Sequence, residues 1–235
     1  MTSIKRSIPN AITLLNLVSG VAAIIFAFHY QEQIGALAGY QWAFICIGAA
    51  ALFDFCDGAS ARLLGAYSPL GKELDSLADL TSFGLAPTML VYNCIVLNNG
   101  GDPFYPWAFV AFVIAACGAM RLAKFNIDTR QTTSFIGLPI PAGAIFWIGM
   151  IGWIQSHFYP ANWVVALIVV LMSLMMVSNL KMFSLKFKNF RLKENFRRYV
   201  IILAAILFVW ANGLAGLAWT ILLYILISAV GRRIE

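Results

Sequence analysis

Apolar stretches long enough to cross a lipid bilayer occupy most of this 235-residue chain. A helix needs about 20 apolar residues to span the hydrocarbon core. Eight segments approach that length: 10–29, 40–61, 76–97, 104–122, 139–156, 161–180, 199–212 and 215–231. The chain is 61% apolar and 11% charged, whereas soluble domains are roughly 45–50% apolar and about 25% charged. We therefore expect an all-α integral membrane protein of about eight transmembrane helices, with residues 1–235 forming one membrane domain.

The basic residues fall on one side of this expected bundle. An even number of spans places both termini on the same side of the membrane. All 16 Lys and Arg residues lie in the segments of that side, which are 1–9, 62–75, 121–138, 181–198 and 232–235. Because cytoplasmic loops carry the excess of Lys and Arg, we expect both termini to be cytoplasmic. This basic surface suits anionic membrane lipids or a phosphate-bearing substrate, and no soluble basic face remains to bind nucleic acid.

Four aspartates lie close together where the second and third apolar segments approach the cytoplasm. They are Asp54, Asp57, Asp75 and Asp79. A carboxylate at bilayer depth costs ~2.5–3.5 kcal/mol, so these groups must face one another around something positive. The first two are three residues apart and the last two are four apart, so each pair shares one face of a helix. Gly, Ser and Pro within residues 63–70 predict a short turn between the two helices.

This acidic cluster favours metal-dependent phosphoryl transfer. Carboxylates this dense stay ionised only when cations compensate them, and Mg²⁺ suits carboxylate and phosphate oxygens. Two ions stabilise both the attack on a phosphoryl group and the departure of the leaving group. Gly58 and Ala61 leave room for a bulky substrate beside the helix, and Arg62 can bind phosphate oxygens. An ion-coupled membrane transporter is the alternative from another class, although a proton pathway does not need small residues beside each carboxylate.

The spacing of these residues resembles the signature of the CDP-alcohol phosphotransferases at all eight of its fixed positions: Asp54-x-x-Asp57-Gly58-x-x-Ala61-Arg62, then eight residues, then Gly71-x-x-x-Asp75-x-x-x-Asp79. The resemblance implies a membrane enzyme, commonly a homodimer, that exchanges CMP on a CDP-linked alcohol for a second alcohol. It implies two divalent ions, Mg²⁺ or Mn²⁺, and a general base at Asp79. It also implies a set of metal ligands, which are Asp54, Asp57, Asp75 and Asp79. The CDP site that it implies is lined by Gly58, Ala61, Arg62 and Gly71.

Further segments are similar to one branch of that family, the bacterial membrane-integral phosphatidylserine synthases. They are residues 8–20, 76–92, 120–126 and 135–144. This similarity implies that CDP-diacylglycerol and L-serine react to give phosphatidylserine and CMP, at the cytoplasmic face of a bacterial inner membrane. Glycerol 3-phosphate or an inositol phosphate is the alternative acceptor. Such an acceptor would favour a denser basic cluster than Arg121, Lys124 and Arg130 provide.

Two smaller groups of polar residues are candidates for substrate binding. Asn10, Thr13 and Asn16 recur every three residues along the first apolar segment. They either make hydrogen bonds between helices or, as the resemblance implies, contact CDP. Arg121 and Lys124 lie three apart at the cytoplasmic end of the fourth segment. They are candidates for binding the serine carboxylate or a lipid phosphate, and anchoring at the membrane surface is their alternative role.

Overall fold

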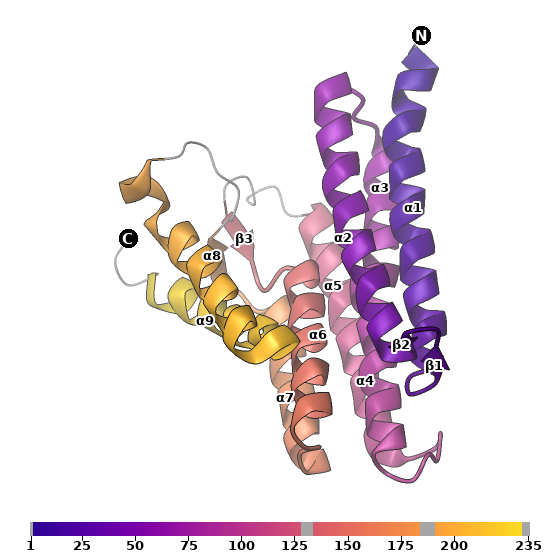
Figure 1. Ribbon diagram of the computed structural model, residues 1–235. Coiled ribbons are helices and arrows are strands. Elements are labelled where there is room, and N and C mark those ends of the chain that lie inside the picture. Colours follow the sequence, from indigo (N-terminus) through magenta and orange to yellow (C-terminus); the bar gives the residue numbers. More distant parts are fainter. Residues whose placement is uncertain (1, 128–133, 184–190, 232–235) are drawn as a thin grey trace.

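The computed structural model describes residues 2–127, 134–183 and 191–231, and these form a bundle of helices (Figure 1). The α-helices are α1 (Thr2–Phe28), α2 (Gly39–Leu64), α3 (Pro69–Asp79), α4 (Ala86–Leu97), α5 (Phe112–Ile127), α6 (Ile140–Ser156), α7 (Asn162–Val177), α8 (Leu192–Asn212) and α9 (Gly216–Gly231). The shorter helical segments are the π-helix η1 (Leu80–Leu85) and the 3₁₀-helices η2 (Pro106–Ala111) and η3 (Gly213–Ala215).

Within the described ranges, two small antiparallel strand pairs lie in the connections between helices. They are β1 (Gln33–Ile34) with β2 (Leu37–Ala38), and β3 (Ser134–Ile136) with β4 (Lys181–Phe183). In the second pair Phe135 lies opposite Met182. This pairing joins the segment before α6 to the segment after α7, two regions far apart in the sequence. The expectation of an all-α protein holds for the membrane-spanning segments, and the strands are confined to loops.

Among the residues that the structure describes, five helical segments are long and apolar enough to cross a membrane, as expected for an integral membrane protein. They are Ser7–Phe28, Gly39–Leu64, Pro69–Leu97, Pro106–Ile127 and Asn195–Val230. Helices α6 and α7 are apolar but shorter. The last segment has 36 residues, and it folds back on itself because Gly213 adopts a positive φ of 57°. Helices α8 and α9 therefore pack against each other as separate helices (Figure 1).

Helix α1 lies along α2 and along the continuous helix formed by α3, η1 and α4 (Figure 1). Half of the largest fully buried side chains of the described residues belong to η1, α4 and α6, among them Phe83, Leu90 and Trp147. Helix α6 also packs against α9, so the core connects the N-terminal helices to the C-terminal hairpin. The four aspartates lie on α2 and α3, and α1 contacts two of them, Asp57 and Asp79.

The predicted turn between α2 and α3 is confirmed at residue level. Helix α2 ends at Leu64, and Gly65 follows in the left-handed conformation with φ 59°, which glycine adopts without steric cost. Helix α3 begins at Pro69, whose missing N–H is not needed in the first turn. The Ser68 hydroxyl accepts a hydrogen bond from the Gly71 N–H at 2.9 Å and so caps the new helix.

A π-helical segment interrupts the helix directly after Asp79. Its last hydrogen bond runs from the Ala86 N–H to the Thr81 carbonyl, five residues back. Pro87 has no N–H and its ring excludes the carbonyl four residues earlier, so regular α-helical pairing fails in this turn. Such π-helical bulges occur frequently at functional sites.

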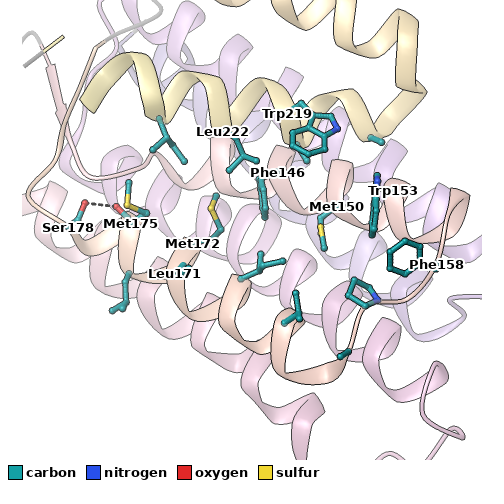
Figure 2. A pocket seen from close by; sticks show the side chains of 18 residues that line it. Phe146, Met150, Trp153, Phe158, Leu171, Met172, Met175, Ser178, Trp219 and Leu222 are labelled. Carbon is teal, nitrogen blue, oxygen red and sulfur yellow. Dashed lines mark hydrogen bonds between the residues drawn. The ribbon is translucent and has the colours of Figure 1, made fainter. Parts of the chain in front are cut away.

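A large cavity of about 870 Å³ lies between α6, α7 and α9 (Figure 2). Apolar side chains such as Met150, Trp153 and Trp219 line it, and none of its 18 lining residues is titratable. It shares no residue with the acidic cluster. Its lining can contact hydrocarbon, and none of its lining side chains is an acid or a base that could transfer a proton or hold Mg²⁺.

The close crossing of α6 and α9 gives a stability prediction. A Cβ added at Gly149 would lie 2.2 Å from the Ala218 backbone nitrogen. We expect Gly149→Ala to lose about 1–3 kcal/mol of stability, the usual cost of overpacking, which would lower the melting temperature in detergent. Gly48→Ala is the matched control, since a Cβ there meets nothing within 4 Å, and its melting temperature should stay unchanged or rise. Equal melting temperatures for both variants would contradict the observed helix crossing.

Candidate active site

Three of the four aspartates converge where α2 and α3 meet. Carboxylate oxygens of Asp54, Asp57 and Asp75 all lie within 4.8 Å of one another. Asp57 is buried and the other two are half-buried. Asp79 is not part of this group, but it lies near enough to Asp54 and Asp75 to interact with them electrostatically. The helical spacing therefore placed three carboxylates together, as predicted, and the fourth beside them.

Helix α1 supplies hydrogen bonds to two of these carboxylates. The Thr13 hydroxyl donates to Asp57 Oδ2 at 2.6 Å. The Asn16 side-chain amide donates to Asp79 Oδ1 at 3.3 Å. Interhelical hydrogen bonding, one of the two roles considered for these residues, is thus confirmed for Thr13 and Asn16. Contact with CDP stays a prediction for all three polar residues of this helix.

A small cavity of about 200 Å³ opens beside the carboxylates. Its lining includes seven of the predicted site residues: Asn10, Thr13, Asp57, Gly58, Ala61, Gly71 and Asp75. The remaining lining residues are Pro9, Ala66, Tyr67, Ser68 and Lys72. The cavity is therefore enclosed by α1, the end of α2, the turn and the start of α3, and one side of it is acidic.

Small residues keep this cavity open. A Cβ added at Gly71 would lie 3.1 Å from Asn10 Oδ1 and 3.0 Å from Ser68 Oγ, which is too close without movement of the neighbours. A Cβ at Gly58 would lie 3.6 Å from Arg62 Nη1, so Arg62 reaches back over the small residue. Arg62 itself is exposed, and its guanidinium is available at the rim of the cavity.

The side chains of the two candidate acceptor-binding residues contact different parts of the structure. Arg121 on α5 is buried, and its guanidinium lies 5.1 Å from the centre of the Phe125 ring. It is also close enough to Asp79 for electrostatic attraction. Lys124 is exposed, and its ammonium donates to the Val177 carbonyl at 3.3 Å. Arg121 is thus the member of the pair that lies near the acids, and Lys124 binds the end of α7.

Sequence reasoning gave no site role to Lys72, although it follows Gly71 directly. Lys72 lines the cavity, and its ammonium donates to the Asn126 carbonyl at 2.9 Å. The Asn126 side chain in turn donates to Ser76 Oγ at 2.9 Å. These bonds fasten the end of α5 to α3. In the sequence, Lys72 served only as one of the basic residues that predict the cytoplasmic side. Its position directly after Gly71 was the local feature that could have indicated a place in the site.

The carboxylates fit a divalent cation. Oδ1 of Asp75 is buried and has no hydrogen-bond partner among the described residues, a costly arrangement unless another group compensates it. The three converging carboxylates offer hard oxygen donors, which Mg²⁺ and Mn²⁺ prefer. Asp54, Asp57 and Asp75 would hold such an ion, and Asp79 lies beside them.

Comparison with known proteins places this arrangement in a family. The sequence profile of the CDP-alcohol phosphatidyltransferase family matches residues 6–178, most of the chain. The chain belongs to this family. The match covers all four aspartates and ends just after α7, so β4, α8 and α9 lie beyond it. Family membership favours a transferase over the transporter that the residues alone left open.

Several similar proteins carry the name CDP-diacylglycerol–serine O-phosphatidyltransferase. One from Methanocaldococcus jannaschii is 34% identical over 77% of this chain and 77% of its own length. One from Mycobacterium leprae is 33% identical over 74% of this chain and 61% of its own length. One from Helicobacter pylori J99 is 31% identical over 94% of this chain and 89% of its own length. The last similarity covers more of the chain than the family profile does, which ends at residue 178.

The fit of the carboxylates to a divalent cation predicts how a substitution at Asp75 changes metal affinity. We expect Asp75→Asn to weaken Mn²⁺ binding by more than the roughly 10–100-fold that outer-shell partners contribute in metal sites, because it removes a charged ligand of the cluster. Isothermal titration calorimetry on the purified protein measures this directly. Glu73→Gln is the matched control, because Glu73 is an exposed acid on the same helix and should bind Mn²⁺ as the unaltered protein does. Equal affinity in both variants would remove Asp75 from the site.

Proposed function

We propose that the protein transfers the phosphatidyl group of CDP-diacylglycerol to the hydroxyl of L-serine, giving phosphatidylserine and CMP. The observation that carries the proposal is the convergence of Asp54, Asp57 and Asp75 beside a cavity walled by small residues. The family supplies the reaction class, and the printed names of the relatives supply the acceptor. The acceptor thus rests on similarity, whereas the site chemistry also rests on the geometry of this chain.

The cavity beside α1 is the proposed CDP site. Asp54, Asp57 and Asp75 would hold two divalent ions, Mg²⁺ or Mn²⁺, which would supply the positive charge that neutralises phosphate oxygens. Asn10 and Thr13 contact the CDP moiety from α1. Gly58, Ala61 and Gly71 form walls that the nucleotide approaches closely, because none carries a side chain larger than methyl. Arg62 pairs with phosphate oxygens through its planar guanidinium.

Asp79 is the proposed general base. It lies one helical turn beyond Asp75 and is close to the other acids. Its carboxylate takes the proton of the serine hydroxyl while that oxygen forms a bond to the β-phosphorus. The bond between the β-phosphorus and the CMP oxygen breaks, and CMP leaves with the electron pair. Asp79 also lies near enough to Asp54 and Asp75 to interact with them electrostatically, and it would share in holding the metal pair.

Arg121 is the proposed partner of the serine carboxylate. It is a buried cation attracted to Asp79, so a carboxylate bound to it would bring the serine hydroxyl toward the base. Lys124 lies farther along α5 with its ammonium at the end of α7. We propose that Lys124 binds the lipid phosphate or the same serine carboxylate. Its ammonium would then release the Val177 carbonyl.

We also propose a membrane topology, a cellular location and an assembly for the protein. Eight spans are obtained when α3, η1 and α4 count as one helix, η2 and α5 as another, and α8 and α9 separately. With the basic residues on the cytoplasmic side, both termini and the acidic site face the cytoplasm of a bacterial inner membrane. Residues 1–235 then form one catalytic membrane domain, and a homodimer is the proposed assembly, by resemblance to the family.

The acceptor is tested by supplying purified protein with CDP-diacylglycerol, Mn²⁺ and one radiolabelled acceptor at a time. We expect serine to yield labelled lipid and stoichiometric CMP, and glycerol 3-phosphate or an inositol phosphate to yield neither. Lipid product from a phosphorylated acceptor alone would replace serine in the proposal and keep the reaction class. No CMP release with any alcohol would overturn the reaction class itself.

The base is tested with Asp79→Asn. We expect kcat to fall by ~10²–10⁴-fold, the usual contribution of a positioned general base, because an amide cannot take the hydroxyl proton. Binding of CDP-diacylglycerol should be retained, which equilibrium binding measures separately. Near-normal turnover by this variant would show that another group accepts the proton.

A further inference from the structure

Asn16 stands apart from the other two polar residues of α1. Asn10 and Thr13 line the cavity beside the carboxylates, whereas Asn16 does not. The Asn16 side chain is completely buried, at 0% exposure, and its amide donates to Asp79 Oδ1 at 3.3 Å. The polar face of α1 therefore divides into a part at the proposed CDP site and a single residue against the proposed base.

The backbone around Asn16 is fixed to the helix that carries Asp79. The Ser82 hydroxyl, one turn after Asp79, donates to the Asn16 carbonyl at 2.9 Å. A Cβ added at Gly20 would lie 2.8 Å from the Ser82 Cα, so α1 and η1 touch backbone to backbone. Ser82 is itself completely buried. These contacts leave little freedom in the distance between Asn16 and Asp79.

The Asn16 amide also lowers the stability of the fold in a way that packing alone does not explain. Its Oδ1 is buried without a hydrogen-bond partner among the described residues. A buried acceptor left unpaired costs about 1–3 kcal/mol, whereas a leucine of similar size would fill the space without that loss. The opposite orientation of the amide would set its oxygen against an acceptor-only carboxylate. Within the described residues, the bond to Asp79 is the side-chain hydrogen bond that Asn16 makes, and it is the contact for which an amide is needed at this position.

We propose that Asn16 is a positioning residue for the base, and that it takes no part in binding CDP. Its N–H bond holds Asp79 by Oδ1 and leaves Oδ2 to receive the proton of the attacking hydroxyl. This inference rests on the proposed role of Asp79. It differs from the role that family resemblance implied for Asn16, and it separates the residues of α1 that bind the nucleotide from the residue that sets up proton transfer.

The test compares Asn16→Leu with Asn10→Leu, a matched change two turns away on the same helix. Steady-state kinetics would be measured with CDP-diacylglycerol, Mn²⁺ and serine. We expect Asn16→Leu to lower kcat by roughly 10–100-fold, the usual effect of losing an outer-shell partner. The KM for CDP-diacylglycerol should stay within about twofold, since ground-state binding is not touched. Asn10→Leu should mainly raise that KM.

Asn16→Asp provides a second variant that keeps the side-chain volume but loses the N–H donor. It should also lower kcat, because the new carboxyl group repels Asp79 or shares a proton with it instead of donating an N–H bond, while the CDP affinity should stay close to that of the unaltered protein. Two results would overturn the proposal: a raised KM for CDP-diacylglycerol with normal kcat in the Asn16 variants, or normal values of both. If the unaltered protein uses an acceptor other than serine, the same comparison with that acceptor still tests Asn16. Failure of the acceptor assignment is therefore distinguishable from failure of this inference.

Discussion

Negative charge inside membrane-spanning helices is the constraint on which the rest of the site depends. Asp54, Asp57 and Asp75 bring carboxylate oxygens within 4.8 Å of one another, in segments that otherwise suit a bilayer. Each such charge is costly unless compensated. The neighbouring residues meet part of that need. The Thr13 hydroxyl donates to Asp57. Asp79, beside the cluster, accepts a hydrogen bond from the Asn16 amide and is attracted by the buried Arg121. The remaining compensation is what divalent cations would supply.

The acidic cluster and the turn between α2 and α3 could be predicted from the sequence, because both depend on residues close to one another along the chain. Helical spacing places Asp54 and Asp57 on one face of α2, and the residues of the turn fix where α3 begins. The surroundings of Arg121 and Lys124 could not be predicted in this way, because they depend on helices that are distant in the sequence. Three residues apart on one helix, they contact different neighbours, because α7 ends beside Lys124 while Arg121 faces the core. The π-helical turn after Asp79 also depends on packing, with Pro87 as its only sequence signal.

The part of the chain beyond the family match reaches back toward the site. The Tyr224 hydroxyl on α9 donates to the Phe183 carbonyl of β4 at 2.8 Å, and Tyr224 is close enough to Arg121 to interact electrostatically. The acidic cluster and the CDP cavity are thus built by α1, α2 and α3, whereas the surroundings of Arg121 include α9. The proposed metal ligands and base therefore lie within the family-wide region, whereas the surroundings of Arg121, the proposed acceptor-binding residue, include the C-terminal hairpin.

The central claim is that the clustered carboxylates hold divalent ions against the diphosphate of a bound nucleotide. Anomalous diffraction from crystals grown with Mn²⁺ and CDP-diacylglycerol tests it most directly. The account predicts manganese peaks among Asp54, Asp57 and Asp75, with the diphosphate oxygens in contact with them. Carboxylates that turn away from one another, with no manganese between them and the nucleotide bound elsewhere, would contradict it.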